Sequence, residues 1–264
     1  MKPKLIALDL DGTTLNGQSE FNPITIQTLH RLTELGHKIA IVTGRPYRSS
    51  KHLYEELGLG GPLVNFNGAL CHIPNDENWQ GEFHVTLDED FHKELECDYF
   101  MVEAKHHLYA TIENIPDSPY YPKDQQPILL QKDTQLLEKP TAITVFSSIE
   151  KQPFIKEKIK QRYGHTIDVR TWGGDMPCLE IVTYGIDKST GIQHLSRYYG
   201  IPTEDVLAFG DEDNDLEMIE FAGHGVAMNN AIDSLKAIAD DITPLPHDQD
   251  GLAHYLMNYF KLEA

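Results

Sequence analysis

The chain has 264 residues and a net charge of −19, because 41 acidic side chains stand against 22 basic ones. A negative field of this size repels the nucleic-acid backbone and anionic lipid surfaces, so we expect no nucleic acid and no membrane among the partners. The 3 cysteines are scattered and no apolar run is long enough to span a bilayer, which predicts a cytoplasmic protein with reduced thiols. We expect a monomer or a homodimer.

The first predicted element is a buried strand, the apolar run 5–8, which stops on two carboxylates, Asp9 and Asp11, and a turn at Gly12. Taken alone, this pattern is typical of a solvated Asp-Gly turn. At the end of a parallel strand it has a second interpretation, because α/β sheets bind their ligands at that edge. Two neighbouring acids there would repel each other and favour a divalent cation.

The next elements repeat this arrangement. A helix is predicted from Asn22-Pro23 to Gly36, and the apolar run 39–42 then ends at Thr43-Gly44-Arg45. This β-α-β order predicts parallel strands, whose ends share one edge of a sheet. A further short strand, at about 63–66, ends in Asn67-Gly68-Ala69.

From about residue 83 the pattern changes. Alternating apolar residues at 99–103 and 108–112 predict an antiparallel hairpin. Further strands are predicted at 142–146, 166–170 and 178–182, with a helix at about 152–163. Strands and helices without β-α-β alternation indicate an α+β domain, which we place at 83–182 as an insertion.

The α/β pattern returns near residue 183. A helix begins at Asp187-Lys188, and the apolar run 206–209 ends in Gly210-Asp211 through Asn214-Asp215. The predicted fold class is therefore α/β, a Rossmann-like parallel-sheet core of residues 1–82 and 183–264 with an inserted α+β cap domain at 83–182.

The polar strand ends predict a magnesium and phosphate site. Converging carboxylates suit octahedral oxygen coordination, and an EF-hand calcium loop is disfavoured because a strand precedes Asp211. Thr43 and Gly44 offer a hydroxyl and an N–H to a phosphate oxygen, and Lys188 offers a positive charge. A Thr-Gly pair is usually a turn and a helical lysine is usually solvated, so the prediction depends on all of these residues occurring together.

Four ordered motifs of the chain resemble those of the haloacid dehalogenase superfamily: Asp9-Leu10-Asp11-Gly12-Thr13, Thr43-Gly44-Arg45, Lys188 with Gly191, and Gly210-Asp211 through Asn214-Asp215. The long insertion between the second and third motifs, together with Asn67-Gly68-Ala69, is similar to the Cof-type phosphatases, which carry a large α/β cap. The resemblance covers both core segments, whereas the cap matches only in position and class.

The resemblance implies a phosphoric monoester hydrolase that depends on Mg²⁺. Asp9 would be the nucleophile that forms an aspartyl-phosphate, and Asp11 the general acid and base. Magnesium would be held by the Asp9 carboxylate, the Asp11 main-chain carbonyl and Asp211, with Asp215 in support. The cap would close over the site and select the leaving group.

The resemblance also implies which residues bind the substrate. Thr43, the Gly44 amide, Lys188 and Asn214 would hold the phosphoryl oxygens, whereas Arg45 would either contact substrate or brace the acidic cluster. The expected substrate is a small phosphorylated metabolite, with sugar phosphates as the leading class. The alternatives are a phosphomutase or phosphotransferase with the same intermediate, and a phospholigand-binding regulator without turnover.

Overall fold

The computed structural model describes residues 2–88, 91–95, 97, 99–113, 126–131, 133–172 and 178–262. Contacts divide the chain into two units. The first comprises Met1–Gly44, Lys51–Phe83 and Asp187–Ala264, and the second comprises Arg45–Ser50 and His84–Ile186. The predicted domain boundaries, after residues 82 and 182, stay a prediction.

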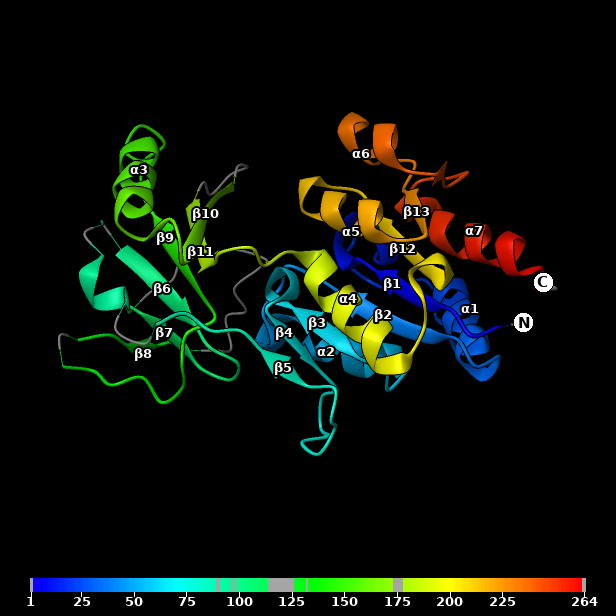
Figure 1. Ribbon diagram of the computed structural model, residues 1–264, viewed down its shortest axis with the longest axis horizontal. Helices are drawn as coiled ribbons and strands as arrows, with labels where there is room; N and C mark the ends of the chain where they lie inside the picture. The colour runs from blue at the N-terminus through cyan, green and yellow to red at the C-terminus, as the bar shows by residue number, and fades with distance from the viewer. Residues whose placement is uncertain are drawn as a thin grey trace. The chain divides into compact units, whose positions relative to one another are not determined.

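The sheet of the first unit has β1 (Leu5–Leu8) in its middle (Figure 1). On one side of β1 follow β12 (Val206–Gly210), β13 (His224–Ala227) and β14 (Asp241–Ile242). On the other side follow β2 (Lys38–Val42), β3 (Leu63–Asn65), β4 (Leu70–His72) and β5 (Phe83–His84). The pairs from β14 to β3 are parallel, as predicted, and β4 runs antiparallel to β3.

The core of the first unit lies around β1, whose four residues are all fully buried. A strand covered on both faces by helices reads as a continuous apolar run, which is why the run 5–8 predicted this strand. The helices are α1 (Pro23–Glu34), α2 (Tyr47–Leu57, whose residues 47–50 are counted with the second unit), α4 (Lys188–Tyr199), α5 (Leu216–Phe221), α6 (Asp233–Ile238) and α7 (Gly251–Phe260). Short single-turn helices complete the unit: η1 (Leu10–Thr14), η2 (Phe66–Gly68), η4 (Thr203–Asp205), η5 (Asp213–Asp215) and η6 (His247–Gln249).

The second unit is built on a six-stranded sheet in the order β10-β11-β9-β6-β7-β8. Its elements are β6 (Tyr99–Glu103), β7 (Leu108–Ala110), β8 (Ile128–Leu129), β9 (Ala142–Phe146), β10 (Ile167–Trp172), β11 (Cys178–Thr183), the helix α3 (Gln152–Tyr163) and the short helix η3 (Phe91–Glu94). The pairs from β10 to β7 are antiparallel, and β6 and β7 form the predicted hairpin. Apolar side chains such as Val102, Ile143 and Leu179 form its core.

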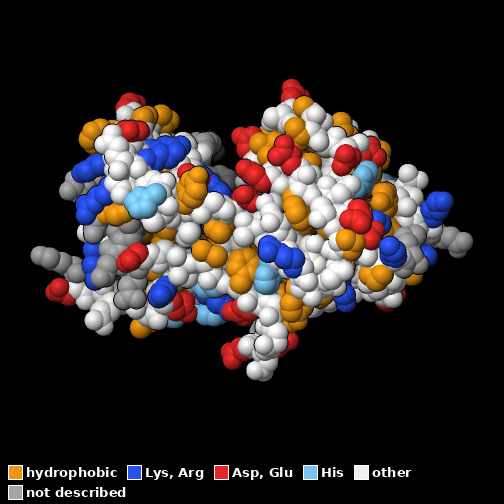
Figure 2. All heavy atoms as spheres, viewed as in Figure 1, with side chains coloured by type: hydrophobic (Ala, Val, Ile, Leu, Met, Phe, Trp, Pro, Cys, Tyr) orange, Lys and Arg blue, Asp and Glu red, His pale blue; other side chains and the backbone are white. Residues whose placement is uncertain are grey.

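The surface charge is uneven on the face that Figure 2 shows. Lys and Arg side chains gather over α3 of the second unit, whereas Asp and Glu side chains gather over α5 and α6 of the first. On this face the acidic side chains of the first unit are therefore concentrated over α5 and α6, and other parts of the same unit carry Lys and Arg side chains. Within the described residues, none of the helices combines the length and the apolar character that crossing a membrane requires.

Candidate active site

The turn after β1 is shaped by Gly12. Its φ of +74° is left-handed, and a Cβ there would lie 2.1 Å from Asp211 Oδ2, so only glycine fits without displacing that carboxylate. The adjacent Thr13 hydroxyl donates to Asp211 Oδ1 over 3.1 Å. These contacts bring the end of β1 against the loop that follows β12. The strand order of the sheet reverses between β1 and β12, and α/β folds bind ligands at such a point.

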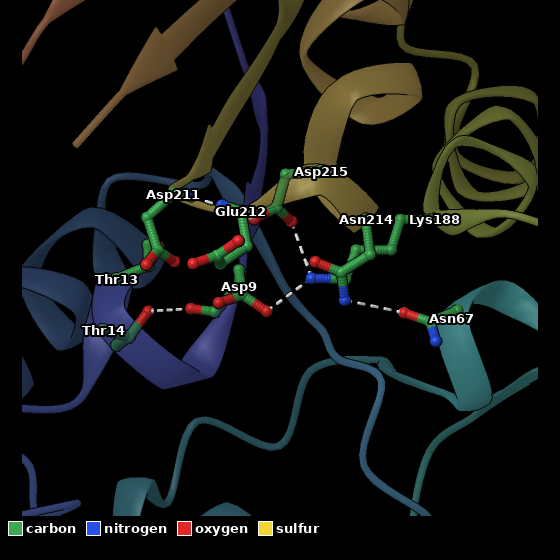
Figure 3. Close-up of polar contacts among 9 residues, drawn as sticks. All are labelled: Asp9, Thr13, Thr14, Asn67, Lys188, Asp211, Glu212, Asn214 and Asp215. Atoms are coloured by element: carbon green, nitrogen blue, oxygen red, sulfur yellow. Dashed lines mark hydrogen bonds and ion pairs between the residues drawn. The ribbon is translucent and has the colours of Figure 1, made fainter. Parts of the chain in front are cut away.

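Asp9 is the first residue after β1, and 5% of its surface is exposed. Its main-chain oxygen accepts a hydrogen bond from the Thr14 hydroxyl, and its Oδ1 accepts one from Lys188 Nζ over 2.6 Å (Figure 3). Within the described part of the chain, no group donates to Asp9 Oδ2. This oxygen is therefore available to a metal ion or to a substrate atom.

Lys188 is held at the start of α4 by its predecessor. Asp187 caps the helix by accepting from the Thr190 amide over 3.2 Å, so Lys188 is the first helical residue. Its side chain is 1% exposed, and its Nζ donates to Asp9 Oδ1 and to Asp215 Oδ1, each over 2.6 Å. The lysine that a helical pattern would leave in solvent is thus buried between two carboxylates.

Asp215 is fully buried, and the hydrogen bonds in Figure 3 occupy both of its carboxylate oxygens. Oδ1 accepts from Lys188, and Oδ2 accepts from the backbone amides of Asp211 and Glu212 over 2.9 and 3.1 Å. These bonds fix the loop after β12 in place. Asp215 therefore supports the positions of Lys188 and Asp211.

Asp9, Asp211 and Asp215 form a buried cluster in which one carboxylate oxygen of each residue lies within 4.8 Å of the other two. Burial and the nearby Asp215 carboxylate raise the pKa of Asp211 to about 7, against the hydrogen bond from Thr13. Burial also raises the pKa of Asp9 well above its usual value, because the attraction of Lys188 does not offset burial and the neighbouring carboxylates. An excess of negative charge at a buried place is what a bound cation would relieve, so the cluster could hold a metal ion.

The pKa of Lys188 is shifted in the direction of its charged form. Burial acts to lower this pKa, but the charges of Asp215 and Asp9 and the hydrogen bonds to them outweigh burial and raise it above its usual range. The side chain is therefore an ammonium group at neutral pH. It supplies a fixed positive charge beside three carboxylates.

The structure places the other predicted residues as follows. Asp11 lies half-buried in η1, and its side chain is not part of the carboxylate cluster. Thr43 and Gly44 follow β2, and Thr43 is buried. Arg45 directly follows Gly44 and is half-buried, and its predicted role stays a prediction.

Asn214 lies in η5, and its Nδ2 donates to Asn67 Oδ1 over 3.0 Å (Figure 3). Sequence reasoning placed Asn67 at the end of a strand, in Asn67-Gly68-Ala69, but gave it no role. It also missed the contact of Thr13 with Asp211. The available signal for Asn67 was its position after a strand that ends at the same edge of the sheet.

Comparisons with known proteins agree with this fold. Residues 6–256 match the family described as haloacid dehalogenase-like hydrolase. The 5-amino-6-(5-phospho-D-ribitylamino)uracil phosphatase YitU of Bacillus subtilis is 38% identical over 273 residues, which cover 99% of each chain. The HMP-PP phosphatase of Serratia proteamaculans is 27% identical over 267 residues, covering 98% of this chain and 96% of the relative.

A solved structure is also similar. The haloacid dehalogenase-like hydrolase from Bacteroides thetaiotaomicron has a TM-score of 0.81 and 28% identity, covering 98% of this chain and 100% of that one. The predicted α/β fold class is confirmed, and the named phosphatases support the predicted enzyme class, a phosphoric monoester hydrolase. Because the family match spans nearly the whole chain, this protein belongs to the haloacid dehalogenase-like hydrolases.

Proposed function

We propose that the chain is a Mg²⁺-dependent phosphatase that hydrolyses small phosphorylated metabolites through an aspartyl-phosphate at Asp9. The observation that carries this proposal is the buried ammonium group of Lys188 between Asp9 and Asp215, beside Asp211. A phosphate ester is itself negative, so it reaches these carboxylates only where positive charge is fixed beside them. A protein that only binds phosphorylated ligands would need no nucleophile such as Asp9, because it transfers no phosphoryl group.

The donor set supports magnesium as the metal. The cluster offers oxygen atoms only, which suits Mg²⁺ rather than a metal that prefers nitrogen or sulfur. We assign the Asp9 and Asp211 carboxylates and the Asp11 carbonyl as ligands, with Asp215 in support because both of its oxygens already accept hydrogen bonds. When bound, the ion would offset carboxylate charge and polarise a phosphoryl oxygen.

In the first step a carboxylate oxygen of Asp9 attacks phosphorus, and the bond between phosphorus and the leaving oxygen breaks. Asp11 gives its proton to that oxygen, which leaves as an alcohol. In the second step Asp11, now a carboxylate, takes a proton from water as the water oxygen attacks phosphorus. The bond between phosphorus and Asp9 breaks, inorganic phosphate is released and Asp9 is restored.

Groups at the strand ends would position the phosphoryl group. We assign this role to the Thr43 hydroxyl, the Gly44 amide, Lys188 and Asn214, with Arg45 as a further substrate contact. Lys188 remains protonated throughout, because the two carboxylates that it contacts raise its pKa. Such transfers depend mainly on positioning and on stabilising charge, which these donors supply.

The substrate class is proposed from the relatives. YitU is named for a compound with a phosphorylated ribityl chain, so phosphate monoesters of sugars and sugar alcohols are the first candidates for this chain. We propose that residues 83–182, the predicted cap, select among them, whereas residues 1–82 and 183–264 carry the chemistry. The named substrate of YitU belongs in any panel tested.

The test is a panel of sugar and sugar-alcohol phosphates incubated with the protein and Mg²⁺, with free phosphate and remaining ester both measured. We expect one phosphate to be released for each ester that is lost, and no phosphate to be released by Asp9→Asn. Isomerised ester without free phosphate would indicate a phosphomutase instead. Ligand binding without any conversion would indicate a regulator.

A further inference from the structure

We infer that Asn67 is a positioning residue for the phosphoryl-binding carboxamide of Asn214. The inference rests on the proposed function, which gives Asn214 its role. It assigns a role to Asn67, which has none in the proposed mechanism. It begins from the hydrogen bond in Figure 3, in which Asn214 Nδ2 donates to Asn67 Oδ1 over 3.0 Å. One N–H of the Asn214 amide is thereby fixed, and the other is left to face a ligand.

Asn67 also contacts the residues that follow β2. Its backbone N–H donates to the Thr43 carbonyl over 3.1 Å. A Cβ on Gly44 would lie 3.1 Å from Asn67 Oδ1 and 3.2 Å from Nδ2, so the Asn67 carboxamide lies against the Gly44 Cα. Asn67 therefore contacts two of the proposed phosphate-binding segments, 43–44 through its backbone N–H and 214 through its side chain.

The backbone at Asn67 is strained. Phe66, Asn67 and Gly68 have φ values of +52°, +50° and +105°, and an aromatic residue rarely adopts this left-handed conformation. In addition, Asn67 Nδ2 is buried and has no hydrogen-bond partner among the described residues. Both features oppose stability, and such features are retained where they serve a site.

Burial separates the roles of the two amides. Asn67 is 1% exposed, whereas Asn214 is half-buried and open to a ligand. A substrate oxygen therefore reaches Asn214 but not the buried Asn67 Nδ2. Asn67 acts through Asn214, by holding its amide in the orientation that donates to the substrate.

Asn67→Gly tests this inference, because glycine removes the carboxamide and accepts the left-handed backbone without strain. We expect kcat/KM for an aryl phosphate to fall roughly ten- to a hundredfold, with a melting temperature near that of the wild type. Asn214→Ala should lose at least as much. The double variant should match Asn214→Ala, because Asn67 has no effect once its target is gone.

Asn65→Ala is the matched control. Asn65 is also fully buried, two positions earlier, and its Oδ1 lies 3.1 Å from His72 Nε2. Its loss should lower the melting temperature and leave kcat/KM of the folded protein unchanged, the opposite of the Asn67→Gly result.

Provided that the wild type releases phosphate, three results would overturn the role of Asn67 and leave the proposed function intact. They are full activity in Asn67→Gly, additive losses in the double variant, and an Asn67→Gly protein without a cooperative melt, which would give Asn67 a structural role. Absence of phosphate release by the wild type and by Asn65→Ala would overturn the proposed function, and the inference with it.

Discussion

The ammonium group of Lys188 contacts Asp9 over 2.6 Å, although 179 positions separate the two residues in the sequence. Lys188 opens α4 and Asp9 directly follows β1, so the contact joins the first and the last sequence segments of the first unit. It places a positive charge against the proposed nucleophile. We expect this arrangement to affect stability, metal binding and turnover.

Lys188→Met should destabilise the protein and remove its activity. The substitution keeps the length of the side chain but leaves Asp9 and Asp215 buried without their cation, which is expected to cost about 3–5 kcal/mol. The free energy of unfolding in urea measures this loss. Lys4→Met is the control, because the 3.1 Å pair of Lys4 with Asp205 is partly exposed and should contribute less than about 1 kcal/mol. Equal stability of the two variants would contradict the proposed role of Lys188.

Gly12→Ala should lower stability and magnesium affinity by more than the backbone strain of alanine alone explains. Gly12 and Gly36 both have left-handed φ values, +74° and +91°, so alanine is expected to cost about 1–2 kcal/mol at either position. At Gly36 an added Cβ meets nothing within 4 Å, whereas at Gly12 it meets Asp211 Oδ2 at 2.1 Å. Unfolding in urea and magnesium titration should show a further loss only in Gly12→Ala. Matching results for the two alanine variants would show that the turn at Gly12 does not shape the site.

Magnesium should stabilise the wild type and restore activity after treatment with a chelator, because the ion offsets buried carboxylate charge. Asp211→Asn should weaken magnesium binding at least about tenfold, since it removes one charge from the cluster. Asp213→Asn is the control, because Asp213 lies in the same loop but is exposed. Calorimetric titration with Mg²⁺ measures both variants. Full activity in the presence of chelator would contradict the proposed dependence on magnesium.

Much of the fold could be predicted because its elements are marked locally. The run at β1 is apolar throughout because helices cover both faces of its sheet. Helix α3 ends at Tyr163 directly before Gly164, as predicted, and α1 begins at Pro23, whose fixed φ suits the first helical position. Such signals lie within a few residues of the feature that they mark.

The antiparallel strand β4 was missed because its cause is not visible in the sequence. The chain reverses through Phe66–Gly68 in left-handed conformations, and Phe66 gives no signal for a positive φ. The Asn67-Gly68 pair indicates a turn but does not say which strand the chain will pair with afterwards.

The residues of the site could be predicted individually, but their contacts could not. Asp9, Lys188 and Asp211 stand at strand ends or helix starts, which the sequence marks. The burial of Lys188 depends on how α4 packs beside β1, a contact between distant segments. The hydrogen bond of Asn67 to Asn214 has the same origin, so no local pattern indicates it.

In the proposed reaction Asp9 becomes phosphorylated during turnover, and trapping the phosphorylated protein is the decisive test. The protein is mixed with substrate and Mg²⁺, quenched in acid within a turnover and reduced with borohydride, which converts an aspartyl-phosphate into homoserine. Peptide mass spectrometry then locates the change. We expect homoserine at position 9 in the wild type, and neither homoserine nor phosphate release in Asp9→Asn. Phosphate release by the wild type with Asp9 unmodified, or continued turnover by Asp9→Asn, would contradict the proposed reaction.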